Sequence, residues 1–110
     1  MPISQNLLNK LIRQELEKLG LAKKYTGFKY ITDLLEILLS NPLMDLAEGF
    51  GKISKLNDVS LDTFEHAIKN MLFNCLRQSE ILQNTVGEYS NKDIKSIINT
   101  LKDIVYRAIA

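Results

Sequence analysis

Residue types that often mark a function are scarce in this chain. Its 110 residues include one cysteine, one histidine, two prolines and no tryptophan. A lone cysteine forms no internal disulfide bond, which excludes the disulfide-rich scaffolds of small secreted proteins. We expect Cys75 to be a small buried hydrophobic residue, and without Cys and His at ligand spacing we expect no metal site.

Long hydrophobic runs are missing as well. The densest apolar segment, residues 34–39, is interrupted by Glu36 and falls far short of the roughly 18 residues that a membrane helix requires. The first residues lack the basic region and apolar stretch of a secretory signal peptide. These absences predict a cytoplasmic protein that does not associate with membranes.

Catalytic motifs are absent too, and neither sign of charge is in excess. The sequence has no glycine-rich phosphate loop, no Cys–His pair at useful spacing and no serine-nucleophile elbow. We therefore expect no enzymatic activity and no cofactor. The 14 basic and 13 acidic residues give a net charge of +1, which argues against nucleic-acid binding through bulk charge alone.

Helical periodicity is the main pattern that the sequence does contain. Apolar residues recur every three or four positions in several segments, each with a plausible cap. We expect helices from Ser4 to Gly20, through Ile31–Leu39 up to Pro42, from Asn41-Pro42 to Phe50, from Ser60 to Cys75, and from Ser90 and Asp93 to Val105. Gly49 and Gly51 predict a break before a short helical piece with Ile53 and Leu56, and residues 77–89 predict a loose stretch. No segment alternates with a period of two, so the predicted fold is all-α, with residues 1–110 as a single compact domain of about six helices.

Four motifs follow one another in a characteristic order. They are Gly27-Phe28-Lys29-Tyr30-Ile31, Phe50 with Ile53-Ser54-Lys55, Ser60 to Leu72 with Glu65 and Ala67-Ile68, and the closing segment Thr85 to Asp103 with Ser90-Asn91. In this order the chain resembles the DNA-binding effector domain of the stage-zero sporulation response regulators of endospore-forming bacteria. Family members also carry an amino-terminal receiver domain, so we expect this single-domain chain to be either an excised effector domain or a divergent relative without a receiver.

The resemblance implies a sequence-specific regulator of transcription that binds duplex DNA through a helix-turn-helix. Ser60 to Asn74 would be the recognition helix in the major groove, and a homodimer or a related regulator would be a further partner. The side chains implied to contact DNA are Lys52, Lys55, Ser60, Thr63, His66, Lys69 and Asn70. The family has arginine at the positions of Thr63, His66 and Lys69, where a guanidinium binds guanine in a bidentate way. Thr63 and a neutral His66 lack that ability.

The regional distribution of charge supports an alternative. Residues 31–65 carry seven acidic side chains and two basic ones, whereas residues 1–30 carry six basic and two acidic. Carboxylates that face a duplex oppose binding. The alternative is a protein-interaction module derived from a helix-turn-helix, an antagonist or co-regulator in which Asp62, Glu65 and Phe73 contact the partner.

Overall fold

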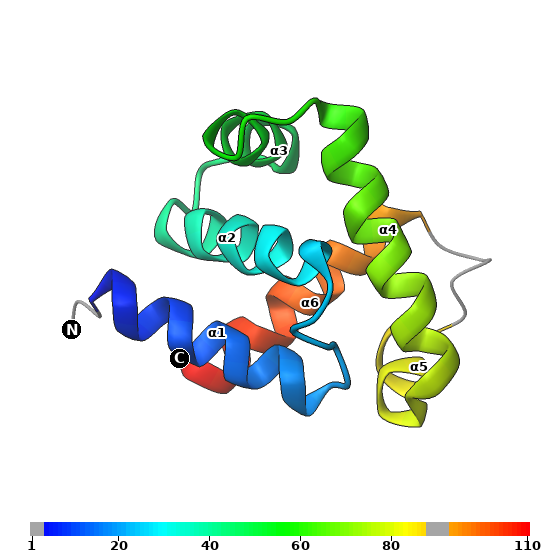
Figure 1. Ribbon diagram of the computed structural model, residues 1–110. Coiled ribbons are helices and arrows are strands. Elements are labelled where there is room, and N and C mark those ends of the chain that lie inside the picture. The colour runs from blue at the N-terminus through cyan, green and yellow to red at the C-terminus, as the bar shows by residue number, and fades with distance from the viewer. Residues whose placement is uncertain (1–3, 88–92) are drawn as a thin grey trace.

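The computed structural model describes residues 4–87 and 93–110, and within these ranges it contains six helices and no strand (Figure 1). The helices are α1 (Gln5–Lys18), α2 (Thr26–Ser40), α3 (Leu46–Leu56), α4 (Leu61–Gln78), α5 (Glu80–Val86) and α6 (Ile94–Ile109). The all-α prediction is therefore confirmed. The caps expected at Ser4 and Ser60 are confirmed as well, because their hydroxyls accept hydrogen bonds from the N–H groups of Leu7 and Thr63.

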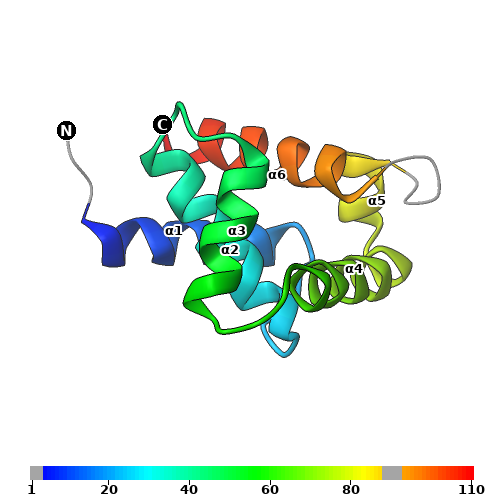
Figure 2. The same ribbon diagram turned by 90° about the horizontal axis from the view of Figure 1, so that it is seen from above.

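Helix α2 lies at the centre of the fold. It packs against α1, α3, α4 and α6, so each of these helices buries its apolar stripe against a common partner (Figures 1 and 2). Ile31, Leu34 and Leu35 on α2 have no exposed surface. Cys75 is 4% exposed, as expected for a small core residue, and burial raises the pKa of its thiol.

Close backbone contact holds α2 against α4. Gly27, in the first turn of α2, faces the backbone of Ala67 and Ile68 on α4. A Cβ atom built on Gly27 would lie 3.0 Å from Ile68 Cα and closer still to the Ala67 carbonyl group. Glycine is therefore required at this position by the approach of another helix.

The beginning of α3 differs from the prediction. Asn41-Pro42 lies in a turn and caps no helix, because α3 begins at Leu46 with Asp45 as its cap. The Asp45 carboxylate accepts a hydrogen bond from the N–H of Glu48 at 2.8 Å. The predicted break at Gly49 and Gly51 is also wrong, since α3 runs through both residues to Leu56.

Residues 77–89 were predicted to be loose, but most of them are helical. Helix α4 continues to Gln78, and Ser79 ends it while also capping α5, with its hydroxyl accepting a hydrogen bond from Leu82 N–H at 3.1 Å. The same hydroxyl donates to the carbonyl oxygen of Leu19 at 3.1 Å, which ties the end of α1 to this junction. For α6 the cap is Asp93, which accepts from Ser96 N–H at 2.7 Å, while the expected capping residue Ser90 lies outside the described residues.

Candidate nucleic-acid interface

A four-residue connector, residues 57–60, joins α3 to α4. The connector begins with a Schellman motif: Asp58 N–H donates to Lys55 O at 3.1 Å and Val59 N–H donates to Ser54 O at 3.0 Å. Asp58 has a φ of 54°, which is the left-handed conformation that this motif needs. The chain therefore ends one helix and starts the next within a single tight turn.

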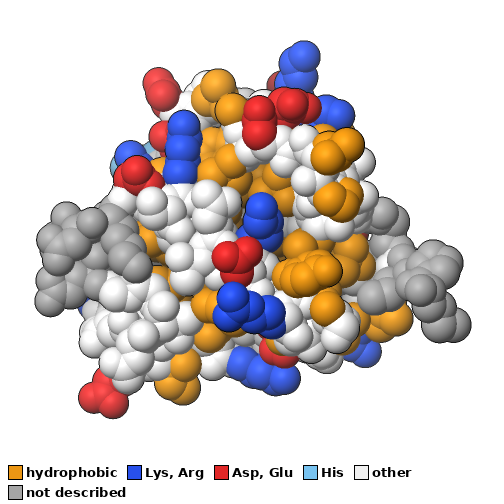
Figure 3. Space-filling view, turned by 180° about the vertical axis from the view of Figure 1, so that it is seen from behind, with side chains coloured by type: hydrophobic (Ala, Val, Ile, Leu, Met, Phe, Trp, Pro, Cys, Tyr) orange, Lys and Arg blue, Asp and Glu red, His pale blue; other side chains and the backbone are white. Residues whose placement is uncertain are grey.

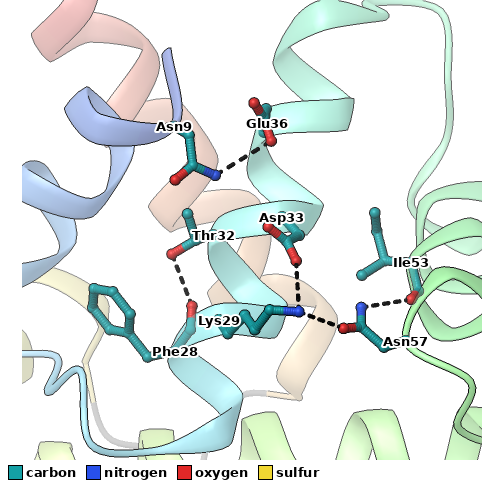
Figure 4. Close-up of polar contacts among 8 residues, drawn as sticks. All are labelled: Asn9, Phe28, Lys29, Thr32, Asp33, Glu36, Ile53 and Asn57. Carbon is teal, nitrogen blue, oxygen red and sulfur yellow. Dashed lines mark hydrogen bonds and ion pairs between the residues drawn. The ribbon is translucent and has the colours of Figure 1, made fainter. Parts of the chain in front are cut away.

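Lys29 on α2 holds the connector in place. Its Nζ atom donates a hydrogen bond to Asn57 Oδ1 at 2.7 Å, and Asn57 Nδ2 donates to the Ile53 carbonyl at 2.9 Å, which closes the end of α3 (Figure 4). Lys29 also lies 3.7 Å from Asp33 Oδ2. Burial raises the pKa of the Asp33 carboxyl, and the neighbouring Lys29 ammonium offsets only part of this rise.

The same view shows two hydrogen bonds along the rest of α2. Asn9 on α1 donates through Nδ2 to Glu36 Oε2 at 3.3 Å, and the Thr32 hydroxyl donates to the Phe28 carbonyl at 2.8 Å (Figure 4). The second bond satisfies a hydroxyl that is 2% exposed. Helix α2 is thus linked by polar contacts to α1 on one side and to the α3–α4 connector on the other.

An aromatic cluster supports α3 and α4 from inside. Phe64 on α4 stacks on Tyr30 of α2 with ring centroids 5.2 Å apart, and meets Phe50 of α3 edge to face at 5.3 Å. Phe64 has no exposed surface. The cluster fixes the relative placement of α2, α3 and α4.

Ser60 caps the first turn of α4 through its side chain. The Ser60 hydroxyl accepts a hydrogen bond from Thr63 N–H at 3.1 Å, and it donates to Thr63 Oγ1 at 3.0 Å. Both residues are exposed. Their hydroxyls are therefore at the surface but already engaged with each other, so any DNA contact by Ser60 or Thr63 uses the remaining acceptor and donor capacity.

The other predicted DNA contacts are also at the surface. His66, Lys69 and Asn70 are exposed on α4, and Asn70 Oδ1 accepts a hydrogen bond from Asn74 Nδ2 at 3.3 Å. Lys52 and Lys55 are exposed on α3. Within residues 4–87 and 93–110, no carboxylate lies within 4.0 Å of the ammonium group of Lys52, Lys55 or Lys69. These three charges are thus available to an anionic partner.

Acidic and apolar side chains share this part of the molecule. Asp62 is exposed, Glu65 is half-buried, and Phe73 is 49% exposed with the Arg77 guanidinium 5.3 Å from its ring centroid. Residues 45–78 contain five acidic and four basic side chains. The surface of α3 and α4 is therefore of mixed charge, with only a few cations to meet phosphate groups.

Sequence reasoning missed the residues that position α4. Lys29 was recognised only as part of the motif Gly27-Phe28-Lys29-Tyr30-Ile31, and neither Asn57 nor Asp58 was assigned a positioning role. The bond between Lys29 and Asn57 spans 28 residues, so no local pattern signals it.

Neither known proteins nor another type of site among the described residues indicates a function for this chain. The chain matches no protein-family model and shows no significant similarity to a curated protein or to a solved structure. Among the described residues, no group of three or more His, Cys, Asp or Glu side chains is arranged to hold a metal ion. In the same part of the chain, no helix combines the length and the apolar character needed to cross a bilayer.

Replacing Asp58 by Gly is expected to raise the free energy of unfolding by about 0.5–1 kcal/mol, because glycine adopts the left-handed conformation without a steric penalty. Urea denaturation followed by circular dichroism measures the change. Asp58→Asn is the matched control: it removes the same charge from the carboxyl end of α3 but keeps a side chain, so its gain should be smaller. A loss of stability in Asp58→Gly would contradict the left-handed assignment.

Proposed function

We propose that this protein binds duplex DNA as a regulator of transcription, with α3 and α4 acting as a helix-turn-helix and α4 entering the major groove. The observation that carries the proposal is the capped, exposed first half of α4, joined to α3 by a four-residue connector and accompanied by three lysines without carboxylate partners in the described parts of the chain. In such motifs the amino-terminal residues of the second helix contact base edges.

Each exposed side chain has a chemically reasonable role in this mode. Lys52 and Lys55 on α3 would neutralise backbone phosphates, which sets the position of the protein on the duplex. Asn70 offers the amide that pairs with adenine, and Lys69 offers an ammonium for guanine or phosphate. Lys29 is exposed, but its ammonium group is engaged with Asn57 and Asp33, so its role in this proposal is to position the connector.

The experiment is fluorescence anisotropy with a random-sequence duplex pool at low salt, repeated over a salt series. We expect binding that weakens steeply as salt rises, and a loss of about tenfold for Lys69→Glu, because the substitution replaces a cation that attracts phosphate by a carboxylate that repels it. Lys95→Glu is the matched control because Lys95 is also an exposed lysine on a helix, but lies on α6, outside the α3–α4 unit. The proposal would be contradicted if both variants lost the same amount of DNA affinity, or if the unmodified protein did not bind DNA.

A second candidate is binding of another protein through the same helices. The observation that favours it is the five acidic side chains among residues 45–78, together with the half-exposed ring of Phe73 and the exposed Leu61. This candidate expects no duplex binding at low salt. It also expects capture of a full-length sporulation regulator that is lost in Phe73→Ala.

A further inference from the structure

A shallow hollow lies on the face opposite α4, outside the α3–α4 unit. It is lined by Leu38, Leu39, Pro42, Lys102, Asp103 and Tyr106, which come from the end of α2, the turn after it and α6. Figure 3 shows the molecule from this side, where hydrophobic side chains lie next to both basic and acidic ones. The hollow therefore combines an apolar lining with charges of both signs.

Large apolar side chains are left in solvent beside this hollow. Leu43, which directly follows Pro42 in the rim, is 100% exposed, and Tyr106 is 59% exposed. The same surface therefore has a projecting apolar side chain and an apolar hollow in which such a side chain can be buried. Covering both would remove apolar area from water, which is favourable in proportion to the area covered.

The two charges in the lining complement each other. Lys102 and Asp103 are adjacent in sequence and line the same hollow, and neither has an ion-pair partner within 4.0 Å among residues 4–87 and 93–110. A surface that holds one unpaired cation beside one unpaired anion is complementary to its own copy turned by a two-fold axis. In an isologous contact of this kind each pair forms twice.

We propose that this surface binds a second copy of the chain about a two-fold axis. Leu43 of each copy enters the hollow of the other, and Lys102 of each copy pairs with Asp103 of the other. The contact uses no residue of α3 or α4, so it is separate from the side chains proposed to bind DNA.

Sedimentation equilibrium without DNA tests the proposal, over protein concentrations up to about 1 mM because the surface is small and the dimer is expected to be weak. We expect a concentration-dependent dimer. Lys102→Asp places like charges opposite each other and should weaken it by about tenfold, whereas the double variant Lys102→Asp/Asp103→Lys restores the pairing and the affinity.

Leu43→Ser is expected to weaken the dimer as well. Its control is Leu56→Ser, because Leu56 is 76% exposed at the end of α3 and does not line this hollow. Circular dichroism establishes that each variant is folded. The proposal is overturned by a monomer at every concentration, by equal effects of the two leucine substitutions, or by a double charge variant that self-associates no better than Lys102→Asp. Because DNA is absent from these measurements, failure here leaves the proposed function untouched.

Discussion

Replacing Phe64 by Ala is expected to lower the free energy of unfolding by about 3–5 kcal/mol, the range for a large aromatic side chain removed from a packed core. Phe64 has no exposed surface and contacts both Tyr30 and Phe50 with ring centroids 5.2 and 5.3 Å away. Its loss opens a cavity between α2, α3 and α4 at once. Chemical denaturation in urea measures the change.

The control for this substitution is on the same helix. Phe73→Ala removes the same side chain from α4 at a position that is 49% exposed, so we expect a change of about 1 kcal/mol or less. Similar losses for the two variants would mean that Phe64 is not the centre of the cluster. If α3 and α4 bind DNA as proposed, a folded but weakly stable Phe64→Ala should also bind DNA poorly, since the cluster sets the position of α4 against α3.

Replacing Gly27 by Ala is expected to have the second large effect on stability. It should lower the free energy of unfolding by about 1–3 kcal/mol, the range for overpacking in other protein cores. The new methyl group would collide with the Ala67 carbonyl and sit 3.0 Å from Ile68 Cα. Both are backbone atoms in the middle of α4, so relief requires movement of the whole helix. This penalty exceeds the gain in helix propensity of roughly 1 kcal/mol.

Gly51→Ala provides a control of opposite sign. Gly51 also lies inside a helix, but a Cβ atom built on it meets nothing within 4 Å. Alanine therefore causes no collision here and adds only its higher helix propensity, so we expect the free energy of unfolding to rise by about 0.5–1 kcal/mol. Thermal unfolding of the two variants side by side measures both changes, and a stabilising Gly27→Ala would contradict the close contact between α2 and α4.

Most of the fold was predictable because its long helices carry clear apolar stripes. Helices α1, α2, α4 and α6 bury residues that recur at helical spacing, including those of α6 from Ile94 to Val105. The start of α3 was not predictable, since Pro42 and Asp45 are both good start signals and only packing decides between them. Gly49 stays helical because it faces Leu34 and Leu38 of α2 at close range, which no local pattern reveals.

The exposed face of α4 was predictable from the same periodicity. The residues and the short helix that hold α4 in place were not. His66 and Lys69 lie opposite the apolar stripe of α4 and are exposed, as predicted. The seven residues of α5 are too few to show a period, and a single serine separates that helix from α4. The role of α3 and α4 in DNA binding stays a prediction.

The bond between Ser79 and Leu19 has a consequence for the order of events in folding. It joins residues 60 positions apart, whereas the pairs α1 and α2, α2 and α3, and α3 and α4 each pack as neighbours along the chain. Contacts of low sequence separation close small loops and form rapidly, while distant ones wait until the intervening chain is ordered. The junction of α4 and α5 is therefore expected to dock on α1 after the rate-limiting barrier, so that it slows unfolding without speeding folding.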